Sequence, residues 1–105
     1  MVRVATHVIV GAQLRRASAA GAFATVLRRG ERQAGALFVL VRHDGGLDLH
    51  APVPGDESGV RRVEAVLSCV DEGEIAERLT SEARFDPDHW VVEIEDAAGR
   101  TFLDG

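Results

Sequence analysis

The stretch ALFVLVR, residues 36–42, decides the fold because both of its alternating sets of side chains are apolar. Successive side chains of a β-strand point to opposite faces of a sheet. One set consists of Ala36, Phe38 and Leu40, and the other consists of Leu37, Val39 and Val41. A strand that is apolar on both sides needs cover on both faces of the sheet. The stretch therefore predicts a central strand between two covering layers.

A second strand pattern precedes this stretch. Residues 22–29 read AFATVLRR, and they are separated from residues 36–42 by GERQAG, which contains two glycines. Two strand patterns joined by a short loop that contains glycine are typical of a hairpin. The sequence therefore predicts that residues 22–29 and residues 36–42 pair directly.

The pattern after the central stretch is less regular. Residues 47–51 alternate apolar side chains with Asp48 and His50, which predicts a strand with one face toward water. Residues 51–59, APVPGDESG, hold two prolines and two glycines and predict a surface loop. Residues 60–70 fit a strand or a helix, and we favour the strand.

Two helices are predicted, one near the start of the chain and one after residue 70. Thr6 can cap a helix that begins at the next residue, and Gly21 is a stop signal for it. Asp71 followed by Glu74 resembles a capping box, with Asp in place of Ser or Thr, and the helix it starts should run to about Arg84. Each helix has an apolar stripe that can cover a sheet.

The end of the chain predicts a hairpin. In residues 90–95, Trp90, Val92 and Ile94 alternate with side chains that include two acids, and residues 101–103 follow a turn as a last strand. The full order is helix, three strands, a doubtful strand, helix and hairpin. This order predicts an α+β fold, with a mostly antiparallel sheet of about five strands and two main helices, in a single domain of residues 1–105.

Composition limits the classes of function. Cys69 is the only cysteine, so no intrachain disulfide can form, and a reducing cytoplasmic setting fits best. We expect Cys69 to be a small buried residue. The longest apolar run, residues 36–41, is too short to span a membrane. Residues 1–42 carry seven arginines and one acid, whereas residues 43–105 carry five arginines and sixteen acids. We expect the two halves to neutralise each other, because a net charge of −5 repels nucleic acid at long range.

The chain resembles the small bacterial proteins grouped as domain of unknown function 1491. The resemblance is carried by QLRRASAAGAFATVLRRGERQAGALFVLV at residues 13–41 and, more specifically, by FDPDHWVVEIED at residues 85–96 and GRTFLD at residues 99–104. It covers nearly the whole chain and is weakest over residues 51–66. It implies a complete small bacterial protein, and it implies no activity, cofactor or catalytic residue.

An arginine group is the first candidate binding surface, for an anion or a partner: Arg15, Arg16, Arg28, Arg29 and Arg32. Arginine recognises phosphate and carboxylate groups through two parallel hydrogen bonds. The alternative is a solvated turn whose arginines form salt bridges with the acidic helix. The chain has no aromatic residues interleaved with these arginines and no recognised nucleic-acid motif, so nucleic acid is an unlikely partner.

A weaker candidate is a metal site at His43, Asp48 and His50, because imidazole and carboxylate groups suit a metal. Polar residues on the wet face of a strand need no metal to explain them, so we predict no metal, and no cofactor motif is present. Ser58 lies in GDESG, which lacks the strand–turn–helix context of a hydrolase nucleophile.

The acids and histidine around Trp90 form the last candidate: Asp86, Asp88, His89, Glu93, Glu95 and Asp96. A catalytic carboxylate pair needs at least one partly buried member. The alternation predicts instead the outward face of a strand.

The function expected from these observations is a non-catalytic protein-interaction or regulatory module that self-associates. If both predicted helices lay on one face of the sheet, the apolar strand at residues 36–41 would leave an uncovered patch, and such patches mark association sites. The alternatives are a small metal-dependent hydrolase using His43, Asp48 and His50, and an anion or nucleic-acid binder using the arginines. An unidentified protein partner is compatible with the first hypothesis.

Overall fold

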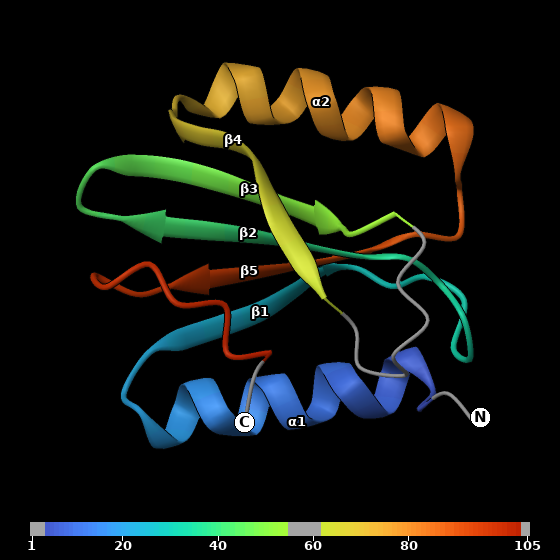
Figure 1. Cartoon of the computed structure of the whole chain (residues 1–105), viewed down its shortest axis with the longest axis horizontal. Helices are drawn as coiled ribbons and strands as arrows, with labels where there is room; N and C mark the ends of the chain where they lie inside the picture. The colour runs from blue at the N-terminus through green and yellow to red at the C-terminus, as the bar shows by residue number, and fades with distance from the viewer. Residues whose placement is uncertain (1–3, 55–61, 104–105) are drawn as a thin grey trace.

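The computed structural model describes residues 4–54 and 62–103, which form one β-sheet with a helix on each face (Figure 1). In this part of the chain there are two helices and five strands. They are α1 (Thr6–Ala19), β1 (Phe23–Arg28), β2 (Leu37–His43), β3 (Gly46–Pro52), β4 (Val63–Val70), α2 (Glu72–Phe85) and β5 (Trp90–Glu95). The α+β class is confirmed, and residues 63–70 are a strand, as favoured from the sequence.

The strand order of the sheet is β1-β5-β2-β3-β4. Every neighbouring pair is antiparallel except β2 with β5, which run parallel. The predicted hairpin of residues 22–29 with residues 36–42 is wrong, because β5 lies between β1 and β2. Val92 of β5 is opposite Val26 of β1 on one side and Val39 of β2 on the other.

The central position predicted for residues 36–42 is confirmed. β2 is third of the five strands, and Leu37 to Val41 are all buried. The side chains of Leu37, Val39 and Val41 pack with α1, whereas Phe38 and Leu40 pack with α2. The two helices therefore cover opposite faces of the sheet. The uncovered patch expected on β2 if both helices lay on one face is therefore not formed.

The two helices begin differently. The side chain of Asp71 accepts a hydrogen bond of 2.9 Å from the backbone N–H of Glu74, so the predicted cap of α2 is confirmed. Thr6 is not the N-cap of α1, because Ala5 holds that position without a side-chain cap. Thr6 instead is fully buried, and its Oγ1 donates to the carbonyl of Gly35 at 2.8 Å. Its hydroxyl joins α1 to the loop before β2.

The predicted last strand at residues 101–103 is also wrong, because this segment has no regular structure. It packs against α1 rather than adding to the sheet. Gln13 donates from Nε2 to the carbonyl of Thr101 at 2.8 Å, and Arg16 donates to the carbonyl of Phe102 at 3.0 Å. Leu103 is buried in the core on the α1 face. The segment thus closes that core from the side.

None of the helices formed by residues 4–54 and 62–103 is long and apolar enough to cross a membrane. Ser58 and most of the predicted loop at residues 51–59 lie outside the described residues, while Ala51 and Pro52 belong to β3.

Candidate functional site

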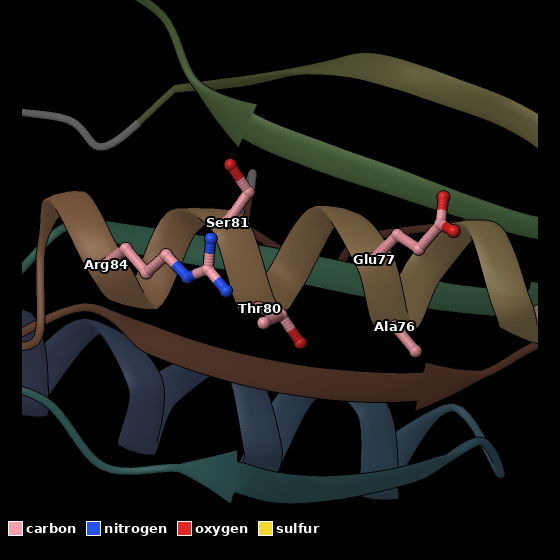
Figure 2. A pocket seen from close by; sticks show the side chains of 5 residues that line it. All are labelled: Ala76, Glu77, Thr80, Ser81 and Arg84. Carbon is pink, nitrogen blue, oxygen red and sulfur yellow. The ribbon is translucent and has the colours of Figure 1, made fainter.

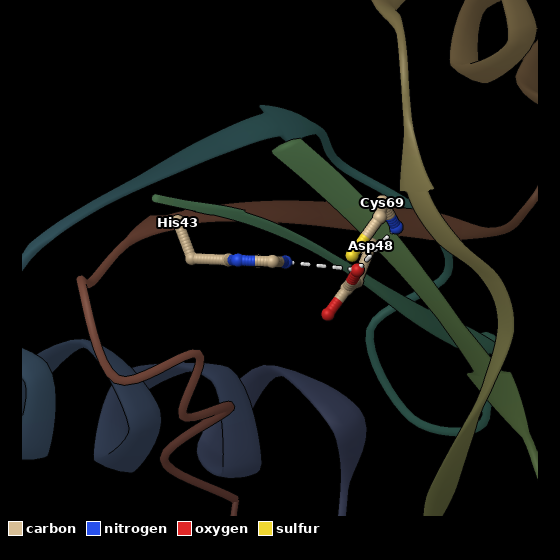
Figure 3. Close-up of side chains that lie close together, drawn as sticks. All are labelled: His43, Asp48 and Cys69. Atoms are coloured by element: carbon tan, nitrogen blue, oxygen red, sulfur yellow. Dashed lines mark hydrogen bonds and ion pairs between the residues drawn. The ribbon is translucent and has the colours of Figure 1, made fainter. Parts of the chain in front are cut away.

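Three potential metal ligands meet where β2, β3 and β4 lie side by side: His43, Asp48 and Cys69 (Figure 3). Their ligand atoms all lie within 4.8 Å of one another. The imidazole of His43 points toward Asp48, and its Nε2 lies 2.9 Å from Oδ1 of that carboxylate. Pairing places Asp48 opposite Val41, so the cluster lies on the α1 face of the sheet. We call these three residues the His–Asp–Cys cluster.

Cys69 enters this cluster because β4 is irregular. The pairing of β3 with β4 shifts register between Leu47 and Leu49, and Cys69 has a left-handed backbone with φ of 54°. Such bulges redirect a side chain, and a left-handed backbone is unfavourable for a residue with a Cβ. The backbone N–H of Cys69 donates to Oδ1 of Asp48 at 2.8 Å, which fixes this geometry. The prediction that Cys69 is buried is wrong, because the residue is exposed.

The ring of His43 has one defined partner. The backbone N–H of Gly45 donates to Nδ1 at 3.0 Å, so the proton of the neutral ring is on Nε2. Nε2 is buried and close to Asp48, yet it makes no hydrogen bond of acceptable geometry. A buried ring nitrogen without a hydrogen bond therefore faces a carboxylate and a thiol.

The carboxylate of Asp48 is held in its charged form. Partial burial opposes ionisation, but the contact with His43 and the hydrogen bond from the N–H of Cys69 outweigh it, so the pKa of Asp48 lies below its ordinary value. His50, the third metal candidate from the sequence, is two residues further along β3 and is not in the cluster. Burial lowers the pKa of His50, and its Nε2 has no hydrogen-bond partner.

The arginine group from the sequence does not form one surface. Arg28, Arg29 and Arg32 belong to the end of β1 and the loop that follows it. Arg32 contacts His7 near the start of α1 at 3.3 Å, whereas Arg16 lies nine residues further along that helix. A rise of about 1.5 Å per residue puts Arg16 roughly 14 Å away along the axis.

Several of these arginines already have partners within the chain. Arg28 donates to the carbonyl of Pro87 at 2.6 Å, and Arg29 lies 5.9 Å from the ring centroid of Trp90. Arg16 donates to the carbonyls of Phe102 and Leu103. These bonds join the ends of β1 and α1 to the C-terminal part of the chain.

The polar residues around Trp90 do not converge either. His89 is buried, with Nδ1 2.7 Å from the carbonyl of Asp86 and its ring edge-on to Phe38. Asp96 forms an ion pair with Arg100 at 2.9 Å beyond the other end of β5. A six-residue strand separates these two ends by about 20 Å, because each residue adds roughly 3.3 Å. The predicted outward face of this strand is wrong, because β5 lies inside the sheet: Val91 is buried with α2, and of the two acids on that face only Glu95 is exposed.

A hollow on the opposite, α2 face of the sheet was not predicted. It has a volume of about 290 Å³ and lies between α2, β1 and β5. Its lining residues are Leu27, Arg28, Leu79, Thr80, Ala83, His89 and Val91. We call it the β1–α2 groove. Two large apolar residues of the elements that form it are highly exposed: Phe23 of β1 at 75% and Phe85 of α2 at 85%.

The outer side of α2 continues this surface (Figure 2). A shallow depression there is lined by Ala76, Glu77, Thr80, Ser81 and Arg84, all of which are exposed residues of one helix. Thr80 lines both hollows. A depression formed by exposed side chains of a single helix cannot enclose a small molecule, but it adds to the area available to a flat partner.

The chain is similar in sequence and fold to known proteins. A family model described as "Protein of unknown function (DUF1491)" matches residues 4–104. The solution structure of protein Atu0922 from A. tumefaciens is 41% identical, with a TM-score of 0.86, covering 96% of this chain and 92% of that one.

Two structures of a DUF1491 family protein from Caulobacter crescentus are also similar. The crystal structure is 38% identical with a TM-score of 0.82, covering 99% of this chain and 95% of that one. The NMR structure is 37% identical with a TM-score of 0.82, covering 99% and 94% of the two chains. No curated protein matches the chain.

Proposed function

We propose that this chain, which belongs to the DUF1491 family, is a non-catalytic interaction module that forms a symmetric homodimer through the β1–α2 groove. The observation that carries the proposal is the exposed apolar side of an edge strand. Phe23 is 75% exposed and Leu27 is 50% exposed, although both belong to β1. Large apolar side chains gathered at one surface usually mark an association site.

These side chains lie on one face of the sheet. Ala24 and Val26 of β1 pack toward α1, so the alternating residues Phe23 and Thr25 face the α2 side. Leu27 lines the groove on that side. Because α2 packs mainly over β3 and β4, it leaves Phe23 and Leu27 of β1 largely exposed. A second copy would supply the missing cover.

The charges at the groove support a second copy of the chain as the occupant. Arg28 lies at one end of β1, and Glu95 of β5 lies opposite Phe23 at the other end. In a dimer with two-fold symmetry, the same patch meets itself in the opposite direction. The Arg28 end of each copy then approaches the Glu95 end of its partner, which is a complementary arrangement.

The opposite edge of the sheet is less suited to pairing. β4 shifts register twice against β3, and Figure 1 shows that it twists across the other strands. Bulges and strong twist protect an edge from further strand pairing. β1 has a single irregularity, between Val26 and Arg28.

Sedimentation velocity over a wide protein concentration range tests the proposal. We expect the wild-type protein to form dimers and Leu27→Asp to be monomeric, because the variant buries a charge in the interface. Val8→Asp is the matched control, since Val8 is 49% exposed and Leu27 is 50% exposed. Val8 lies on α1, away from the groove, so its variant should dimerise normally. A wild-type monomer at every concentration, or an equal loss of dimer in both variants, would contradict the proposal.

A cytoplasmic location is part of the same proposal. The single cysteine, Cys69, is exposed and free. In an oxidising compartment, exposed thiols of two chains would join through a disulfide. In a reducing compartment this disulfide does not form, and two copies associate through the β1–α2 groove alone.

A further inference from the structure

We propose that His43, Asp48 and Cys69 bind a divalent cation of the zinc class, with one coordination position left to water. The site is independent of the dimer proposal, because the His–Asp–Cys cluster lies on the α1 face and the β1–α2 groove lies on the α2 face. No metal-binding motif in the sequence assigns it, since the three residues come from three different strands.

The donor set selects the metal. Thiolate and imidazole groups suit zinc and similar ions, whereas calcium and magnesium prefer oxygen ligands. Zinc sites with three protein ligands keep a fourth position for water or another ligand. Cys69 is exposed, so water can reach this position.

The distances between the three ligand atoms suit a tetrahedrally coordinated ion if the atoms move slightly closer together. Bonds of about 2.0–2.3 Å to zinc place neighbouring ligand atoms about 3.3–3.8 Å apart. The ligand atoms of the cluster lie within 4.8 Å of one another. Rotation of the exposed Cys69 side chain can supply the remaining movement. The carboxylate of Asp48 is already oriented by the backbone N–H of Cys69 at 2.8 Å, which acts as an outer-shell contact.

Coordination by His43 requires one local change. The N–H of Gly45 now donates to Nδ1, so Nε2 carries the ring proton. When Nε2 binds the cation, that proton moves to Nδ1, and the amide of Gly45 turns to water. Gly45 is exposed in the turn between β2 and β3, so the change stays within this turn. Cys69 loses its thiol proton to solvent, so binding should strengthen as pH rises.

Cobalt titration of the reduced protein is the first test. We expect one Co²⁺ per chain and a near-ultraviolet charge-transfer band from a thiolate–cobalt bond, which zinc then removes by displacement. This readout uses the wild-type protein, so it does not depend on the folding of any variant. Absence of the charge-transfer band at saturating cobalt would overturn the proposal.

Matched variants then identify the ligands by zinc calorimetry. Loss of an outer-shell group weakens metal binding by about 10–100-fold, so Cys69→Ser and His43→Gln should weaken it by at least about 100-fold. His50→Gln is the control, because His50 lies on the same strand and outside the cluster. We expect its zinc affinity to match the wild type. Full affinity in Cys69→Ser, or loss in His50→Gln alone, would overturn the assignment.

Discussion

Replacing Gly30 with alanine should destabilise the protein strongly, although Gly30 lies in a loop. The loop packs directly against the chain that leads into β5. A Cβ at Gly30 would lie 2.1 Å from the carbonyl oxygen of Asp88 and 2.6 Å from Cδ1 of Trp90. The first of these contacts involves backbone, so a side-chain rotation cannot relieve it. The two segments must move apart by roughly 1.5 Å to reach ordinary contact.

The magnitude follows from what this movement breaks. The N–H of Glu31 donates to the carbonyl of Asp88 at 2.9 Å, and Nε1 of Trp90 donates to the carbonyl of Glu31 at 2.8 Å. Overpacking costs about 1–3 kcal/mol, and each weakened hydrogen bond adds about 0.5–1.5 kcal/mol. We expect the free energy of unfolding to fall by about 2–6 kcal/mol, which lowers Tm by roughly 10–30 °C.

Equilibrium denaturation in urea, followed by the fluorescence of Trp90, measures the effect. Gly11→Ala is the control, because its new Cβ would meet only Nη1 of Arg15, at 3.5 Å. Gly11 lies within α1, where alanine is favoured by about 0.5–1 kcal/mol. We expect the free energy of unfolding to fall in Gly30→Ala and to rise in Gly11→Ala. A Gly30→Ala protein as stable as the wild type would refute the close packing of this loop against β5.

Asp71→Ala removes the cap on the N–H of Glu74 and should lower the free energy of unfolding by about 1 kcal/mol, measured by thermal denaturation; an unchanged Tm would contradict the cap. Thr6→Val removes the buried hydrogen bond from the hydroxyl to the carbonyl of Gly35 and should lower the free energy of unfolding by about 0.5–1.5 kcal/mol. This loss is not a capping effect, because Ala5 is the N-cap of α1. Hydrogen bonds from Arg100 hold the pKa of Asp96 below its ordinary value, so the pair stabilises the fold above that ordinary pKa and is lost as pH falls through the lowered one. Asp96→Asn should therefore be less stable than the wild type at neutral pH, and the difference should shrink in acid; denaturation in urea at both pH values tests this, and a constant difference would contradict it.

The elements of the fold were predictable where one local pattern decides them. The apolar run from Leu37 to Val41 can be satisfied only by cover on both faces, and both helices provide it. The cap at Asp71 needs only a side chain and an N–H three residues later. Which strands are neighbours was not predictable in this way, because the residue pattern of β5 does not distinguish a place at the edge of the sheet from a place between β1 and β2. Adjacent strand patterns favoured a hairpin, but β5 lies between the two strands.

The candidate site shows the same limit. His43 and Asp48 share one hairpin, so their proximity could be inferred from the sequence. Cys69 was missed because its position depends on a register shift and a left-handed backbone, which no apolar pattern encodes. In a regular β4 without the register shift, the Cys69 side chain would continue the alternation of faces set by Val66 and Leu67. The exposed apolar surface at Leu27 was missed because it depends on which strands α2 covers.

The place of β5 in the middle of the sheet constrains how the protein is made. During synthesis on a ribosome, β1 leaves the exit tunnel long before the strand that must lie between it and β2. At about 5–20 residues per second, the interval lasts several seconds. Throughout that interval the newly made α1 and β1 have no sheet to join. The nascent chain therefore completes this core only after β5 has been made, and a premature stop before Trp90 leaves an aggregation-prone polypeptide for chaperones and proteases.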